Sequence, residues 1–189
     1  MKLKYTLIFM TLLLIMGCEK QEEVVVGGIT ERSPEEQIQA NIQLAPEFAF
    51  HSIDGKQVAL NELRGKIVYV DIWATWCRPC IMQIPALKEV EEMYKDEDIQ
   101  FVSISVDKEK DIQKWRNMVR EKQLGGLQLY AGSDMKFHNE YKISTIPRFL
   151  LIGKEGELIS SDAPRPLNHR TNGVNEELLE VFDQLIKEQ

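Results

Sequence analysis

The sequence feature that most constrains the fold is a strand-like segment that leads directly into two cysteines and then into an amphipathic segment. Residues Ile67–Trp73 are rich in β-formers, and Ile81–Tyr94 has an apolar face at helical spacing. Between them lie Cys77 and Cys80, separated by two residues. The pattern predicts that both cysteines lie where a buried strand ends and a helix begins.

That position favours an ionised sulfur. The first turn of a helix has unpaired N–H groups and the positive end of the peptide dipoles, so we expect the pKa of Cys77 to lie below the ~8.5 of a free cysteine. Arg78 adds a positive charge, and Pro79 suits the first helical turn. Cys80 lies one turn further on the same face. We therefore expect Cys77 to be the exposed attacking sulfur and Cys80 the buried sulfur that resolves a mixed disulfide.

The alternative is half of a zinc site, which requires four ligands. The sequence has no second pair of cysteines at this spacing, and Cys18 is far upstream. The histidines His51, His138 and His169 are scattered without ligand spacing. The pattern favours redox chemistry, and we expect neither a metal nor a cofactor.

The N-terminus has the pattern of an export signal. Lys2 and Lys4 precede a short apolar run, residues 5–16, which ends at Gly17 and Cys18. The segment Ile15–Cys18 resembles the bacterial lipobox, which implies cleavage before Cys18 and lipidation of its sulfur. An ordinary signal peptide or an uncleaved anchor is the alternative. Each of these possibilities places the folded part outside the cytoplasm, and the lipobox interpretation anchors it to the bacterial cell envelope through lipid.

Charge excludes some classes of partner. The formal net charge is −7, and loss of residues 1–17 removes two lysines and no acidic residue, which leaves −9. Such a chain is a poor ligand for nucleic acid or anionic lipid. Membrane attachment is therefore expected through acyl chains. The compartment outside the cytoplasm favours disulfides, and a pair of thiols there needs an electron donor if it is to stay reduced.

The remaining sequence divides into a tether and one domain. Residues 18–43 are polar and acidic and are predicted to be a tether, and residues 44–189 a single α/β domain with a sheet covered by helices on both faces. A hairpin is expected over Pro46–Leu60, and a second core strand over Ile99–Val106, after which Asp107 is expected to cap a helix. Further elements are predicted at 110–122 (helix), 127–130 (strand), 134–141 (helix), 148–152 and 157–159 (hairpin) and 175–187 (helix).

The order of these elements and two motifs resemble one family. The chain resembles the thioredoxin-like superfamily, and most closely its membrane-anchored TlpA/ResA-like thiol–disulfide oxidoreductases. The resemblance runs from Leu44 to the C-terminus, and the motifs are Val70–Cys80 and Thr145–Pro147. It implies a thioredoxin-like fold with a central mixed sheet and an N-terminal β-hairpin extension.

The resemblance also assigns roles to individual residues. Cys77 would be the nucleophile and Cys80 the resolving thiol. Pro147 would be a cis-proline beside the pair, with the Ile146 backbone pairing with the bound partner; a trans proline that starts the strand is the alternative. Trp76 would shield the pair and form a docking surface with Arg78 and Pro79, and core packing is the alternative for the tryptophan.

Two further residues bear on acid–base chemistry. Asp71 matches the buried acid of thioredoxin, so we expect a raised pKa and transfer of the Cys80 proton to it, through water. An acid that points outward at a sheet edge is the alternative. Relatives in the TlpA/ResA branch usually carry a glutamate three residues after the second cysteine, where this chain has Gln83. If that glutamate is the acid–base group in relatives, Asp71 would have to supply this function here.

The leading prediction is a monomeric thiol–disulfide oxidoreductase that reduces protein partners in the envelope, with cytochrome c maturation as one candidate process. A thiol peroxidase is a second possibility, although the Trp-Cys-x-x-Cys motif argues against it. A copper carrier or adaptor is the third; carriers of this fold tend to have cysteines three residues apart and a distant histidine. His138 is the only remote candidate, and it is expected to pack.

Overall fold

The computed structural model describes residues 43–188. The predicted signal segment 1–17, the predicted lipidation site Cys18 and residues 18–42 of the predicted tether lie outside the described residues. Within residues 43–188, the structure has no helix that is both long and apolar enough to cross a bilayer.

A seven-stranded mixed sheet forms the centre of the domain, in the order β2-β1-β5-β4-β3-β6-β7. Strand β3 runs parallel to β4, β4 runs parallel to β5, and β6 pairs antiparallel with β3. The β1–β2 hairpin joins the edge of the sheet at β5, which confirms the predicted N-terminal extension. The strands are β1 (Ala49–Ser52), β2 (Gln57–Ala59), β3 (Ile67–Trp73), β4 (Ile99–Ser105), β5 (Leu127–Tyr130), β6 (Arg148–Ile152) and β7 (Leu158–Ser160).

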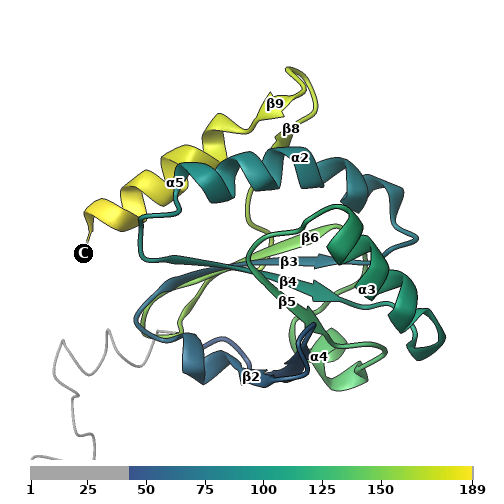
Figure 1. Ribbon diagram of the computed structural model, residues 1–189. Helices are drawn as coiled ribbons and strands as arrows, with labels where there is room; N and C mark the ends of the chain where they lie inside the picture. Colours follow the sequence, from purple (N-terminus) through teal and green to yellow (C-terminus); the bar gives the residue numbers. More distant parts are fainter. Residues whose placement is uncertain (1–42, 189) are drawn as a thin grey trace, which may run out of the picture.

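Helices cover both faces of this sheet, as predicted. Helices α2 and α5 lie on one side, and α4 lies on the other (Figure 1). A separate two-stranded sheet, β8–β9, packs near α2 and was not predicted. The helices are α2 (Arg78–Met93), α3 (Ile112–Glu121), α4 (Met135–Glu140) and α5 (Glu176–Lys187), with 3₁₀ turns at Leu60–Leu63 and Glu109–Asp111; β8 is Leu167–Asn168 and β9 is Gly173–Val174.

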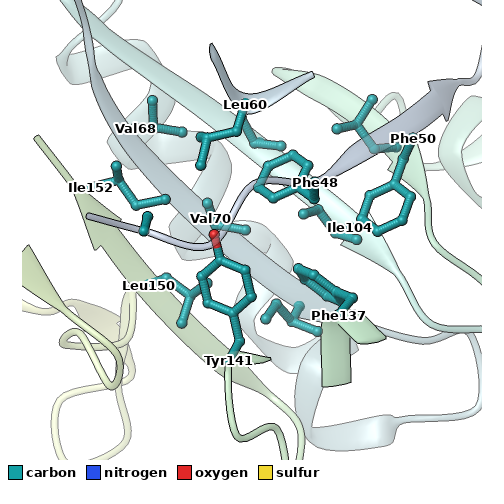
Figure 2. Close-up of a cluster of buried hydrophobic side chains, with 14 of the residues drawn as sticks. Phe48, Phe50, Leu60, Val68, Val70, Ile104, Phe137, Tyr141, Leu150 and Ile152 are labelled. Carbon is teal, nitrogen blue, oxygen red and sulfur yellow. The ribbon is translucent and has the colours of Figure 1, made fainter. Parts of the chain in front are cut away.

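Strand β3 is buried along its whole length, because both faces of the sheet are covered. Its side chains alternate between two cores. Val68, Val70 and Ile72 enter an aromatic-rich cluster with Phe48, Phe50, Leu60, Phe137 and Tyr141 (Figure 2). Ile67 and Tyr69 face the opposite side and pack with residues of α2 and α5. Burial on two sides explains why the strand reads as an almost continuous apolar run.

One predicted cap is wrong. Asp107 does not cap the helix that follows β4, because a 3₁₀ turn intervenes and α3 begins only at Ile112, with Asp111 at its N-cap position. Asp107 is instead fully buried. Its side chain binds a loop that is distant in the sequence, which a local capping rule cannot anticipate.

Candidate active site

Cys77 and Cys80 form a disulfide at the N-terminus of α2, with their Cα atoms 5.3 Å apart. Cys77 is the N-cap residue, and its Sγ accepts a hydrogen bond from the backbone N–H of Cys80 at 3.2 Å. The Cys77 N–H donates to the Ala74 carbonyl at 3.0 Å. The predicted junction between strand and helix is therefore present, and the first sulfur lies at the positive end of the helix dipole.

The expected contrast between an exposed and a buried sulfur is wrong for the disulfide form. Cys77 is 4% exposed and Cys80 is 2% exposed. Both pack in one cluster with Trp73, Ala74 and Trp115. Trp115 comes from α3, which covers the cysteines from the side, so the end of β3 alone does not determine their exposure.

The residues around the disulfide are much more exposed. Trp76 is 66% exposed, and Arg78 and Pro79 are exposed as well. The peptide bond between Ile146 and Pro147 is cis, as predicted, and Ile146 packs against the cysteine cluster. The structure thus brings these five residues to one end of the sheet. Their role in docking stays a prediction.

A groove of about 610 Å³ begins at Trp76 and continues toward α4. Val106, Ile143 and Met135 contribute apolar surface, and the exposed side chains of Lys108 and Lys110 lie along it. His138 also lines the groove and is partly buried. This surface joins the exposed tryptophan to a charged rim that holds two lysines and Asp111.

Asp107 fixes the loop that precedes Cys77. Its carboxylate accepts hydrogen bonds from the backbone N–H of Thr75 at 2.9 and 3.1 Å and from the Thr75 hydroxyl at 2.7 Å. The hydroxyl of Ser105, also fully buried, donates to it at 2.8 Å. Sequence reasoning named Asp107 as a helix cap and missed this contact with the loop before Cys77. The available signal was an acidic residue directly after a core strand that is parallel to the strand leading into the cysteines.

Asp71 lies on the face of β3 that is covered by α2, and it is 6% exposed. Its Oδ1 has no hydrogen-bond partner among residues 43–188. Burial, with a smaller contribution from the charge of Glu91, raises the pKa of Asp71 to about 8. The expected raised pKa is confirmed, and the alternative of an outward-pointing acid at a sheet edge is excluded. Transfer of a proton from Cys80 stays a prediction.

Gln83 has a structural contact. It is 1% exposed, and its Oε1 accepts a hydrogen bond from the backbone N–H of Leu167 at 3.0 Å. The side chain therefore ties α2 to the start of β8. Its Nε2 has no partner among the described residues.

The part of the chain that the structure describes contains no group of three His, Cys, Asp or Glu side chains that could hold a metal ion. The cysteine pair, the cis-proline and a buried acid in β3 are what the site offers for chemistry. Two sulfurs held within bonding distance can accept and release two electrons by disulfide exchange.

Comparison with known proteins agrees with this geometry. The model of the AhpC/TSA family matches residues 42–161. The chain belongs to this family. A thiol–disulfide oxidoreductase ResA of Bacillus cereus is 26% identical over 156 residues, 82% of this chain and 87% of that protein. A ResA of Bacillus thuringiensis is 31% identical over 117 residues, which cover 61% of this chain and 65% of that protein.

Solved structures show the same fold. The solution structure of a candidate thiol–disulfide oxidoreductase of Bacteroides vulgatus is 45% identical, with a TM-score of 0.63, over 74% of this chain and 89% of that one. The thioredoxin domain of another oxidoreductase of that organism superposes with a TM-score of 0.64 at 23% identity, over 76% of this chain and 96% of that one. The predicted thioredoxin-like fold and the resemblance to the ResA branch are confirmed.

Proposed function

We propose that this protein is a thiol–disulfide oxidoreductase that reduces disulfides of protein partners outside the cytoplasm. The observation that carries the proposal is the Cys77–Cys80 pair at the start of α2, beside the cis Ile146–Pro147 bond. The relatives named as thiol–disulfide oxidoreductases support the same class of reaction.

The reaction follows from the two sulfurs. In the reduced protein, the Cys77 thiolate attacks a partner disulfide, forms a mixed disulfide and releases one partner thiolate. Cys80 gives its proton to Asp71 and attacks the Cys77 sulfur. This step releases the second partner thiolate and closes the Cys77–Cys80 disulfide. Two electrons pass to the partner, whose two thiolates take protons from solvent.

The surface around the pair supports a protein as substrate. We infer that a partner contacts the exposed Trp76, Arg78 and Pro79, which surround the buried sulfurs. We infer that the backbone of Ile146, next to the cis-proline, pairs with the partner chain. Aromatic and arginine side chains are common anchors of protein interfaces.

The location and direction of the reaction are part of the proposal. The signal-like segment 1–17 and the lipobox-like sequence at Cys18 favour a lipid-anchored monomer that is held to the envelope by residues 18–43. Such a protein needs a membrane or envelope electron donor to keep Cys77 and Cys80 reduced. Cytochrome c maturation is one candidate process. A reduction potential of about −250 mV or below would agree with a reductase, and about −120 mV with an oxidant.

Trapping tests the proposal most directly. Without Cys80, a mixed disulfide on Cys77 cannot be resolved from within the protein. We expect Cys80→Ser, expressed in its own cell envelope, to accumulate disulfide-linked partners that disappear on reduction. The Cys77→Ser/Cys80→Ser variant is the control and should capture none. Equal capture by both variants, or an empty trap, would contradict the proposal, and efficient peroxide turnover by the purified protein would favour the thiol peroxidase alternative.

A further inference from the structure

We propose that Glu91 is a second proton-handling group of this site, which passes the proton between buried Asp71 and solvent. The inference rests on the proposed function, because the proton in question is the one that Cys80 gives to Asp71 during disulfide exchange. Glu91 would act through Asp71 and would not touch the reacting sulfurs.

A small cavity connects the two acids. Asp71 lines it from β3, and Glu91 lines it from the middle of α2. Its volume is about 10 Å³, close to the minimum that holds one water molecule. Three side chains of the lining carry buried polar atoms with no hydrogen-bond partner among residues 43–188: Asp71 Oδ1, Trp73 Nε1 and Gln128 Oε1. Between apolar walls from Ile84, Leu87 and Leu124, the cavity thus offers these three atoms as hydrogen-bond partners for a bridging water.

The opposite wall is shaped to receive the Glu91 carboxylate. A Cβ atom at Gly125 would collide with Glu91 Oε2. At Gly126, where φ is +60°, a Cβ would lie 2.8 Å from the Phe101 carbonyl oxygen and 3.2 Å from Glu91 Oε1. The glycine pair that follows α3 thus leaves the space in which the half-buried Glu91 turns inward, toward the side of the sheet that holds Asp71.

The charges around the cavity favour proton exchange between these two acids. The pKa of Glu91 is raised to about 7, because the effect of burial outweighs the opposing charge of the exposed Lys88 on the same helix. Lys88 Nζ also donates to the Lys122 carbonyl at 3.1 Å, at the end of α3. On β3, Tyr69 lies two residues before Asp71, and its pKa is raised mainly by burial. Among the described residues that line the cavity, Lys88 alone has a cationic side chain.

The pathway balances as a transfer of one proton. Cys80 loses its proton to the Asp71 carboxylate as its sulfur attacks Cys77. Asp71 passes the proton, through one water, to the Glu91 carboxylate, which releases it to bulk solvent at the outer wall of the cavity. Asp71 is then ionised again for the next cycle. Because both acids have pKa values near neutral pH, the transfer between them is close to balanced.

The test uses single-turnover oxidation of the reduced protein by oxidised glutathione, a small disulfide that avoids the docking surface. Glu91→Gln keeps the shape and removes the ionisable group. At pH 7 we expect the resolving step to slow by about tenfold, below the ~10²–10⁴ that a direct acid–base group supplies. Imidazole buffer should restore the rate in proportion to its concentration, and Glu91→Asp should retain part of it. Glu92→Gln, one residue along and exposed, should match the parent protein.

A second variant moves the carboxylate without removing it. Gly125→Ala should displace Glu91 from the cavity and produce the same slowing. Carboxyl-carbon NMR adds an independent readout: Asp71 should titrate at lower pH in Glu91→Gln, because the repulsion is gone. Parent-like rates in both Glu91→Gln and Gly125→Ala would overturn the relay, whether or not the Asp71 titration moves.

Comparison with Asp71→Asn separates the two proposals. If Asp71→Asn slows resolution and Glu91→Gln does not, only the relay fails. If neither variant is slow while insulin is still reduced, Asp71 and the relay both fail, and the oxidoreductase proposal stands. If the parent protein does not reduce insulin, the oxidoreductase proposal itself fails.

Discussion

The buried contact between Asp107 and the loop before Cys77 allows a quantitative prediction. Asp107→Asn preserves the shape but replaces the charged acceptor with a neutral amide. In the parent protein, the Thr75 N–H donates to both carboxylate oxygens, at 2.9 and 3.1 Å. In the variant, one of these oxygens is replaced by an NH₂ group, so that two donors face each other. The Thr75 and Ser105 hydroxyls lose a charged partner as well.

The expected cost follows from these contacts. Hydrogen bonds to a charged group contribute about 1.5–3 kcal/mol each, and the contacts at one carboxylate are not additive. We therefore expect Asp107→Asn to lower the free energy of unfolding by about 3 kcal/mol. For a chain of this size the melting temperature should fall by roughly 6–12 °C.

The assay is urea denaturation of the oxidised protein, followed by circular dichroism. Glu109→Gln is the matched control, because this acid is exposed in the same connection and should change stability little. Thr75→Val should lose part of the same energy, and the double variant should lose less than the sum. A loss below about 0.5 kcal/mol in Asp107→Asn, or full additivity with Thr75→Val, would refute this reasoning.

Other perturbations give distinct outcomes. Asp71 binds a proton in the folded oxidised protein up to about pH 8, against 3.8 for an ordinary carboxyl, so folding stability should fall as pH rises across that window. Relative to the parent protein, Asp71→Asn should become more stable as the pH rises, by up to roughly 4 kcal/mol between pH 5 and pH 8.5 in urea titrations; a constant difference would contradict this. Gln83→Glu should keep the hydrogen bond from the Leu167 N–H but bury a charge, so the free energy of unfolding of this variant should fall from pH 5 to pH 8. An unfolding free energy that does not change with pH would mean that the new carboxyl lies in solvent. Phe137→Ala, in the aromatic cluster of Figure 2, should lose about 3–5 kcal/mol of unfolding free energy by the same method, and a loss near 1 kcal/mol would mean that the cluster closes over the gap.

The centre of the domain could be predicted because its signals are local. Residues 67–73 are apolar enough to identify a strand covered on both faces, and the cysteine spacing with Pro79 marks the helix start. Gly125 and Gly126 follow the end of α3 at Glu121, and nothing in the local sequence shows the space that they leave for Glu91. That space is visible only in the folded protein, because Glu91 lies on α2 and is distant from the glycines in the sequence.

The errors also have tertiary causes. Asp107 has the local pattern of a helix cap. Its carboxylate instead accepts hydrogen bonds from the N–H and the hydroxyl of Thr75, 32 residues earlier in the sequence. The burial of Cys77 depends on Trp115 from α3, which no pattern near the cysteines encodes. Strands β8 and β9 have two residues each, too short for a periodic signal.

Reduction of insulin by the purified protein, with dithiothreitol as the electron source, tests the central claim most directly. The measurement is the rate at which the freed B chain precipitates, compared with dithiothreitol alone and with Cys77→Ser. If the pair at the start of α2 exchanges disulfides, the parent protein accelerates precipitation and Cys77→Ser does not. Equal rates with the parent protein, with Cys77→Ser and with dithiothreitol alone would contradict the claim.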